Sequence, residues 1–274
     1  MGPKARLGLG VVACTLCGSA PTSADSLPGV PQFLASCTLT HRLPDDPIVH
    51  FGMPGMSHMH DFFGNVSANA FSTRRRLDRA RTTCHPNGDR SGYWTPTLYV
   101  RGRPVGTSSV TIYFEARPAR VDEVRPYPLG LKMIAGHAMA RRPPRDGHAL
   151  WYCKGVAARG STRIPVCPSW SRVRLVVRFP DCWDGRRLDS PDHRRHMAYS
   201  AAGACPARAP VLVPRARFDI EYRTRGAAGA LIASGPGYTA HGDFFNAWRP
   251  RVLAARIDRC IRGRLRCDYN GQPY

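Results

Sequence analysis

"YWTPTLYV", residues 93–100, and "SSVTIYFEA", residues 108–116, are the stretches that decide the fold class. Both have the length of a strand and are rich in β-branched and aromatic residues, and the turn "RGRP" follows the first. Further runs of this kind lie at 130–136, 172–179, 211–222 and 230–235, with Pro and Gly between them. Many short strands separated by turns predict a mostly β, β-sandwich-like fold.

The C-terminal part has a different period. From Asp243 onward, "DFFNAWRPRVLAARIDRCIRGRLRC" places its apolar residues at helical spacing. We therefore predict a C-terminal α-helix with Asp243 as N-cap, in which Pro250 breaks the first turn before a longer helix begins. The mature chain shows no linker, so we expect a single domain.

The N-terminus has the features of an export signal. A short basic head, Met1 to Arg6, precedes an apolar run and then small residues, which is typical of a cleaved signal peptide. We assign residues 1–24 to the signal, 25–36 to an N-terminal extension and 37–274 to a secreted, monomeric domain. Acylation of Cys14, as in a lipoprotein, is a second interpretation. The apolar run is too short to span a bilayer, and we expect no membrane span elsewhere.

The cysteine count agrees with export. Once the signal is removed, eight cysteines remain, without the Cys-x-x-Cys spacing of zinc sites: Cys37, Cys84, Cys153, Cys167, Cys182, Cys205, Cys260 and Cys267. An even number in an oxidising compartment predicts four disulfides. Pairing of sequential neighbours is the simplest arrangement, and the short loops 153–167 and 260–267 are the pairs that we predict; the other pairs stay open.

The net charge of +21 suggests an anionic partner. Nearly all the positive charge is arginine, however, and a GC-rich coding sequence produces this composition without selection for binding. The arginines are scattered, and no basic tract has interleaved aromatic residues. We therefore expect no nucleic-acid partner.

Three segments carry the residues that suggest chemistry. "GMSHMHDFFGN" at 55–65 contains His58, His60 and Asp61, and side chains two apart in an extended segment share one face. "DSPDHRRHMAY" at 189–199 contains Asp192, His193 and His196, with the histidines at helical spacing. "TAHGDFFNAW" at 239–248 repeats the His, Asp-Phe-Phe theme with His241 and Asp243. A helix starting there would favour neutral His241.

Two interpretations of these segments are open. In the first they converge on one polar cleft, where the candidate catalytic residues are His60, Asp61, Asp192, His193 and Asp243. His60 or His193 would then act as general base or acid, oriented by an aspartate. In a metal-binding variant, His58, His60 and one of His196 or His241 hold zinc or copper. In the second interpretation, buried His–Asp pairs only brace irregular loops.

Other chemistries find little support in the sequence. Disulfide pairing would consume the thiols that a cysteine nucleophile needs. The chain has no Gly-x-Ser-x-Gly elbow, no phosphate-binding Gly-x-x-x-x-Gly-Lys and only three glutamates for a glycosidase pair. The tryptophans could stack on sugars, but packing in the core is their usual role.

Three long blocks resemble a known family. "DDPIVHFGMPGMSHMHDFFGN", "FPDCWDGRRLDSPDHRRHMAY" and "HGDFFNAW" are similar to the signature blocks of the domain of unknown function 1996, over about residues 37–267. Phe51-Gly52 departs from the Pro-Gly that the family leads one to expect. The resemblance implies a secreted protein of actinobacteria or filamentous fungi, joined in some fungi to carbohydrate-binding modules. It implies no activity.

These observations favour a hydrolase or lyase that acts on extracellular or cell-wall polysaccharide. The alternative is a non-catalytic carbohydrate- or wall-binding module that uses exposed tryptophans. In a third interpretation the histidines hold the loops together and do nothing else.

Overall fold

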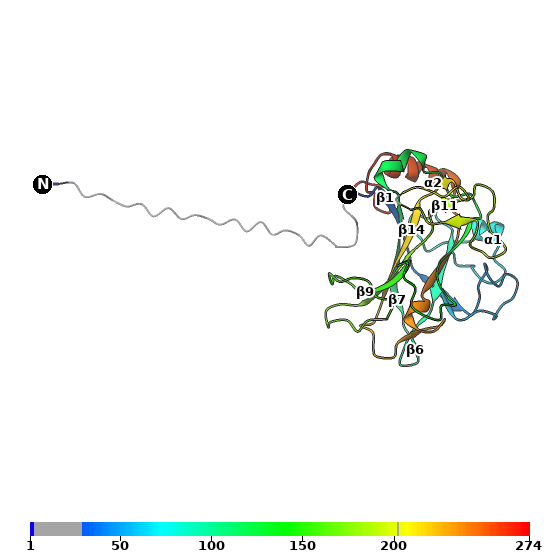
Figure 1. Ribbon diagram of the computed structural model, residues 1–274, viewed down its shortest axis with the longest axis horizontal. Coiled ribbons are helices and arrows are strands. Elements are labelled where there is room, and N and C mark those ends of the chain that lie inside the picture. The colour runs from blue at the N-terminus through cyan, green and yellow to red at the C-terminus, as the bar shows by residue number, and fades with distance from the viewer. Residues whose placement is uncertain (3–28, 202) are drawn as a thin grey trace.

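The computed structural model describes residues 1–2, 29–201 and 203–274 (Figure 1). The predicted signal peptide, with Cys14, lies almost wholly outside these residues. Two five-stranded antiparallel sheets dominate the fold. The first sheet has the order β1 (Gln32–Cys37), β7 (Thr107–Glu115), β14 (Arg215–Tyr222), β10 (Val173–Arg178), β9 (Ala149–Cys153). The second has the order β2 (Leu39–Leu43), β3 (His60–Gly64), β4 (Gly92–Pro96), β16 (His241–Phe245), β8 (Lys132–Gly136).

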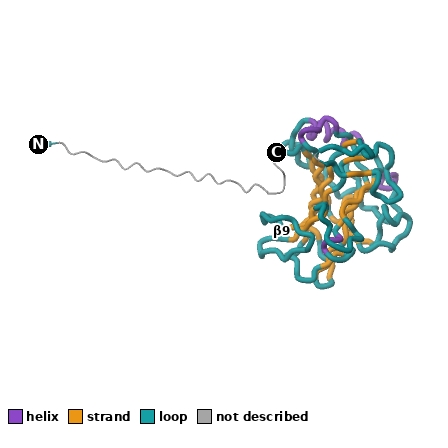
Figure 2. Tube along the Cα trace, viewed as in Figure 1, coloured by secondary structure: helices purple, strands orange, loops and turns teal. Residues whose placement is uncertain are grey.

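Smaller elements complete the fold. Two three-stranded sheets comprise β12 (Met197–Ala198), β11 (Cys182–Trp183) and β13 (Val211–Leu212), and β15 (Leu231–Ile232), β5 (Leu98–Val100) and β6 (Arg103–Pro104). The helical elements are α1 (Arg74–Arg79), η1 (Pro118–Glu123), η2 (Gly237–Thr239), α2 (Pro250–Arg256) and the π-helical turn η3 (Ile257–Arg262). Figure 2 shows the strands as inner layers with loops around them.

Aromatic residues from both large sheets form the core between them. Tyr93 of β4 packs edge-to-face on Phe218 of β14, with ring centroids 5.3 Å apart, and Phe244 of β16 lies 6.5 Å from Phe114 of β7. These contacts, all between buried rings, join the sheets face to face as in a sandwich. The predicted mostly β, single-domain fold is confirmed.

The second sheet is covered on its other face as well. Phe62, Trp94 and Phe245 form a separate buried cluster there with Ile48 and with Leu77 of α1. The loop that carries Ile48 and the helix α1 therefore cover the outer face of the second sheet. This covering makes that face a dry environment for any polar side chain that points into it.

The C-terminal helix is confirmed, but its predicted start is wrong. The helix α2 begins at Pro250, with Arg249 as N-cap, whereas Asp243 lies in the middle of strand β16. The segment 241–245 pairs with both β4 and β8, and this burial between two strands overrides the helical spacing of its apolar residues. Proline is well placed at the first helical position because its missing N–H has no partner there anyway.

Four disulfides join sequential neighbours. They are Cys37–Cys84, Cys153–Cys167, Cys182–Cys205 and Cys260–Cys267. The two predicted short loops are confirmed, and the simplest overall pairing is the one observed. Strand β1 begins at Gln32, inside the segment 25–36, and pairs along its whole length with β7. The folded part of the chain thus starts before Cys37.

Buried Asp89 gives the fold a pH dependence that can be measured. Its carboxylate accepts hydrogen bonds from the Tyr93 hydroxyl at 2.6 Å and from the Ser91 backbone N–H at 3.0 Å, but burial raises its pKa to about 6. The native state therefore holds a proton that the unfolded chain releases at lower pH, and this stabilising contribution is lost as pH rises through about 6.

We expect wild type to lose about 2 kcal/mol of unfolding free energy relative to Asp89→Asn between pH 4 and pH 7. Urea unfolding with disulfides intact measures both proteins at each pH. Asp78→Asn, at an exposed position of α1, is the control and should track wild type. A constant difference between wild type and Asp89→Asn would contradict the assignment.

Candidate metal site

Strand pairing brings His60 and His241 into one row at one end of the second sheet. His60 is the first residue of β3 and pairs with Pro96, the last residue of β4. On the other side of β4, Asp243 pairs with Trp94, so the register extended by two residues places His241 beside Pro96. His241 also pairs with Gly136 at the end of β8. A Cβ at Gly136 would lie 2.3 Å from the Ala240 carbonyl oxygen, so this close approach requires glycine.

The two Asp-Phe-Phe segments differ by one residue, and this difference decides which aspartate joins the site. Side chains alternate between the faces of a strand. In "HDFF" at 60–63, Asp61 is on the opposite face from His60. In "HGDFF" at 241–245, Gly242 is inserted, so Asp243 shares the face of His241.

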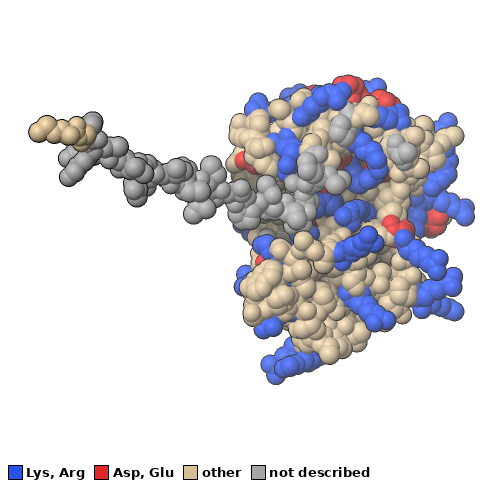
Figure 3. Space-filling view, turned by 60° about the vertical axis from the view of Figure 1, so that its left-hand side comes forward, with Lys and Arg blue, Asp and Glu red and all other residues tan. Residues whose placement is uncertain are grey.

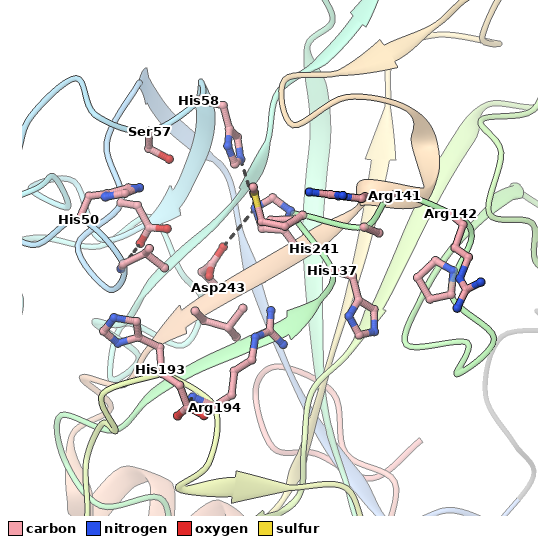
Figure 4. Close-up of a pocket in the computed structure, with 18 of the residues that line it drawn as sticks. His50, Ser57, His58, His137, Arg141, Arg142, His193, Arg194, His241 and Asp243 are labelled. Atoms are coloured by element: carbon pink, nitrogen blue, oxygen red, sulfur yellow. Dashed lines mark hydrogen bonds and ion pairs between the residues drawn. The ribbon is translucent and has the colours of Figure 1, made fainter.

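Three imidazoles meet at this end of the sheet. The Nε2 atom of His241 lies 3.2 Å from Nε2 of His58 and 3.4 Å from Nε2 of His60. Figure 4 shows His58 and His241 directed toward one another, with Asp243 beside His241. His60 and His241 are buried and His58 is partly buried.

The hydrogen bonds of the Nδ1 atoms determine which nitrogen of His60 and of His241 carries the proton. Nδ1 of His60 lies 2.9 Å from the Asp45 carbonyl oxygen, and Nδ1 of His241 lies 2.9 Å from that of Thr239. A carbonyl oxygen only accepts, so each Nδ1 carries the proton, and in a neutral ring Nε2 is then an acceptor. Two acceptor lone pairs thus face each other at 3.4 Å, an arrangement that a shared cation would stabilise.

The three rings are neutral at physiological pH. Burial, followed by the charge of His50, lowers the pKa of His58 to about 4. Burial, followed by the charge of His58, lowers the pKa of His241 to about 3, and burial holds the pKa of His60 well below its usual value. A helix start at this point would also favour a neutral His241. The structure has a buried strand there instead, and burial gives the same protonation state for a different reason. Neutral imidazole is the form that binds metal.

Asp243 adds a carboxylate with an unpartnered oxygen. Its Oδ2 is buried without a hydrogen-bond partner and lies 4.0 Å from Nε2 of His241. Burial and the nearby charge of Asp46 raise the pKa of Asp243 well above its usual value. Asp46 is itself buried, and its Oδ1 accepts the backbone N–H groups of Ile48 and Val49. A buried acceptor with no donor is costly unless a cation or a proton satisfies it.

The donor atoms fall into two overlapping sets. One donor atom each of His58, His60 and His241 lie within 4.8 Å of one another, and so do one donor atom each of Asp46, His60 and Asp243. Three imidazole nitrogens with a nearby carboxylate suit zinc, and imidazole also suits copper. A third cluster, Cys37, Cys84 and Asp89, offers no thiolate, because its cysteines form a disulfide.

His58 and His241 line an open cleft of about 1340 Å³, whereas His60 is fully buried beside them. His58, His241, Asp46 and Asp243 line it, together with residues of three loops: His50, Met56, Ser57, His137, Ala138, Met139, Ala140, Arg141, Arg142, Pro143, Pro144, Arg145, Asp192, His193 and Arg194. In the view of Figure 4, Arg141, Arg142 and His137 lie on the opposite side of His241 from His50 and His193. A buried donor set that opens on a cleft is accessible to a substrate.

The structure brings together some predicted site residues and separates others. His58, His60, His241 and Asp243 lie together, and Asp192 and His193 line the same cleft. Asp61 instead points away from His60, where it pairs with Arg42 at 2.6 Å and accepts the Thr97 hydroxyl.

His196 also lies apart from the other histidines. Its Nδ1 contacts the Ser190 hydroxyl and its Nε2 contacts the Lys132 carbonyl oxygen, so both ring nitrogens have partners. Of the two residues proposed as the third histidine ligand, His241 is therefore the one that approaches His58 and His60. His196 braces the loop at 189–199, as the bracing interpretation expected of some histidines.

His193 is held in an unusual backbone conformation. Its φ is +55°, in the left-handed region that few residues other than glycine adopt. Asp192 accepts the backbone N–H groups of Arg194 and Arg195, and Asp189 lies 2.9 Å from Nδ1 of His193. Both contacts fix the position of the imidazole at the cleft.

Several residues of the cleft do not stand out in the sequence. Asp46 and His50 stand inside the first family block, but no spacing rule connects them with His60. Arg194 reaches the Gly136 carbonyl oxygen at 3.0 Å, and His137 contacts Asp146. Their positions depend on loops whose course local sequence patterns do not predict.

The family model of a domain of unknown function, DUF1996, matches residues 46–248, which include every residue of the two donor sets. The chain belongs to this family. No curated protein and no solved structure matches it. Among the residues that the structure describes, no helix is long and apolar enough to cross a membrane. In this DUF1996 chain the matched region starts at Asp46 and ends just after β16, so it covers the site and stops before α2.

We expect the isolated protein to bind close to one equivalent of zinc or copper. His58→Ala should weaken metal binding by more than about a hundredfold, since the loss of residues that merely orient a ligand costs ten- to a hundredfold. Elemental analysis and titration of the metal-free protein measure both quantities. His193→Ala is the matched control in the same cleft and should keep full metal content; equal loss in both variants would count against the three-histidine site.

As a buried carboxylate Asp243 should destabilise the metal-free protein, and as a metal ligand it should strengthen metal binding. Asp243→Asn removes the buried carboxylate, so the metal-free variant should be at least as stable as metal-free wild type. The same change should weaken metal binding, because a carboxylate is lost beside the three histidines. Thermal melting with and without metal tests both effects. A variant that is less stable without metal and unchanged in affinity would assign Asp243 a structural role.

Proposed function

We propose that this DUF1996 chain is an exported, metal-dependent hydrolase or lyase that acts on extracellular or cell-wall polysaccharide. One observation carries the proposal: the Nε2 atoms of His58 and His60 lie 3.2 and 3.4 Å from Nε2 of His241, and His58 and His241 line an open cleft. Such an arrangement costs free energy in a domain that only needs to fold, and three imidazoles are a donor set that suits a catalytic zinc or copper site.

Export is supported by the covalent structure. Four disulfides join eight cysteines, and such bonds persist in oxidising compartments. The first 24 residues have the pattern of a signal peptide. A wall or secreted polymer is the substrate that an exported enzyme with an open cleft would meet.

In the proposed reaction the metal ligands, His193 and Arg194 have different roles. The metal would lower the pKa of a bound water or polarise an oxygen of the substrate. His193, oriented by Asp189 through Nδ1, would take or give the proton through Nε2. Arg194, which donates to the Gly136 carbonyl oxygen at one side of the site, adds a fixed positive charge near His241 and Asp243. His60 is therefore a metal ligand in this proposal and His193 the general base or acid.

Two reaction types fit these roles and give different products. In hydrolysis, water adds to the anomeric carbon and the leaving oxygen receives a proton, so a new reducing end forms. In β-elimination, a base removes the proton next to a carboxyl group and the glycosidic oxygen leaves, so a double bond forms and no water is consumed. The two products distinguish a hydrolase from a lyase.

A non-catalytic carbohydrate-binding module is the second candidate function. Trp170 is 69 % exposed and lies in a separate hollow with Arg172, Arg223 and Arg225, which suits contact with a sugar polymer. Trp94, Trp151 and Trp248 are buried in the core, as expected for most tryptophans. This candidate predicts polymer binding that survives His58→Ala and falls in Trp170→Ala.

Turnover tests the catalytic proposal. The metal-loaded protein should release new chain ends from an acidic wall or extracellular glycan, detected as reducing ends or as unsaturated ends that absorb ultraviolet light. Removal of the metal by a chelator, or His58→Ala, should abolish turnover. His193→Gln should lower kcat by about 10²–10⁴ with metal content unchanged, the usual effect of losing a general acid or base. Turnover that persists without metal would contradict the proposal.

A further inference from the structure

The loop between β8 and β9 places a group of arginines at the cleft. Arg141, Arg142 and Arg145 are exposed and line the same cleft as the three-histidine site. In the view of Figure 4 the guanidinium of Arg141 is directed toward the His241 side. The loop follows directly from Gly136, which pairs with His241, so the arginines are tied to the site through the sheet.

These three arginines have no acidic partner. Within the part of the chain that the structure describes, none of them makes a hydrogen bond or ion pair. Arginines elsewhere do pair, such as Arg215 with Asp181 and Arg217 with Glu115, both below 3 Å. Figure 3 shows how strongly Lys and Arg outnumber Asp and Glu on one face of the molecule. Exposed arginines without a partner also occur elsewhere in the described chain, as at Arg74 and Arg75 of α1. What distinguishes Arg141, Arg142 and Arg145 is that all three line the cleft.

The carboxylates at or near the cleft are either engaged by other groups or buried. Asp192 accepts two backbone N–H groups and the Ser190 hydroxyl. Asp146, on the arginine loop itself, contacts His137 and the backbone of His148. Asp46 and Asp243 are buried beside the histidines. None of these carboxylates pairs with the three arginines, so an anion from outside would be their partner.

The lining of the cleft excludes other classes of ligand. Among the residues that the structure describes, no Trp, Tyr or Phe lines it, so it lacks the aromatic faces on which neutral sugar rings and single-stranded bases stack. Its volume of about 1340 Å³ exceeds the usual 300–1000 Å³ of a small-molecule pocket. Charge and size together indicate a polymer that carries repeated anionic groups.

We propose that the substrate of this site is an anionic glycan, bound through its carboxylate or phosphodiester groups by Arg141, Arg142 and Arg145 beside the three-histidine site. This inference rests on the proposed function and names its substrate class. Guanidinium forks bind both kinds of anion, so the shared chemistry is a sugar polymer with regularly spaced negative charge.

Binding measured without turnover tests this inference separately from catalysis. The metal-loaded protein is titrated into fluorescently labelled polygalacturonate, a phosphodiester-containing mannan, neutral dextran and single-stranded DNA, at low and physiological salt. The variant Arg141→Gln/Arg142→Gln/Arg145→Gln removes the three charges. Arg74→Gln/Arg75→Gln/Arg76→Gln removes the same charge from exposed positions of α1, which do not line the cleft.

We expect the cleft variant to bind an acidic glycan at least about tenfold more weakly, with a smaller salt dependence, while the α1 variant stays within about twofold of wild type. The tighter of the two acidic glycans identifies carboxylate or phosphodiester as the recognised group. Equal losses in both variants, equal binding of dextran, or arginine-dependent binding of DNA as tight as that of either glycan would overturn the inference.

Metal content separates this inference from the proposed function. If the cleft variant retains metal and turnover and binds like the α1 variant, the substrate assignment fails and the catalytic proposal stands. If arginine-dependent binding is found in a protein that holds no metal and turns nothing over, the catalytic proposal fails and the cleft is a binding site for acidic glycans.

Discussion

The candidate site depends on one constraint, the pairing of strand β4 with both β3 and β16. This pairing sets His60 and His241 on the same face of the sheet, with Pro96 between them, and leaves their side chains to meet above the central strand. Because the side-chain period of a strand is two, a shift of one residue in either pairing would turn one histidine into the sandwich core. The aromatic residues hold this register: Tyr93 and Phe244 pack between the sheets, whereas Phe62, Trp94 and Phe245 pack on the outer face.

Burial of the histidines and Asp243 under the outer loops makes this polar site costly in free energy. Loops cover the outer face, so the imidazoles and Asp243 are removed from water, and every one of their ionised forms except a metal-bound carboxylate is disfavoured. A structural network would normally satisfy each buried donor and acceptor. Here the backbone carbonyls of Asp45 and Thr239 satisfy the Nδ1–H groups, and the atoms left over all point to one place. Partial satisfaction of this kind is typical of metal ligands, whose second nitrogen is held by the protein.

The sequence predicts those features that local patterns determine. Strand-length apolar runs, an even cysteine count and three His–Asp segments are sufficient for a disulfide-linked β fold with most of the site residues. The alternation of side chains also explains why the rings of His58 and His60 lie side by side. What the sequence does not reveal is the face on which each aspartate lies, because "HDFF" and "HGDFF" look alike until the strand pairing is known. For the same reason the helical spacing after Asp243 was misleading: a strand buried on both faces has no period of its own.

The arginine loop illustrates a different limit of sequence analysis. In a chain with a net charge of +21, "ARRPPRDG" at 140–147 is not conspicuous, and its arginines look like the others. Their place distinguishes them: the loop begins at Gly136, whose close contact with His241 anchors one end, and Arg141, Arg142 and Arg145 all line the cleft. Composition therefore explains why the chain has many arginines, whereas geometry explains which of them lie together at the cleft. A polymer that binds there would bring its own negative charge to arginines that no carboxylate in the described part of the chain pairs with.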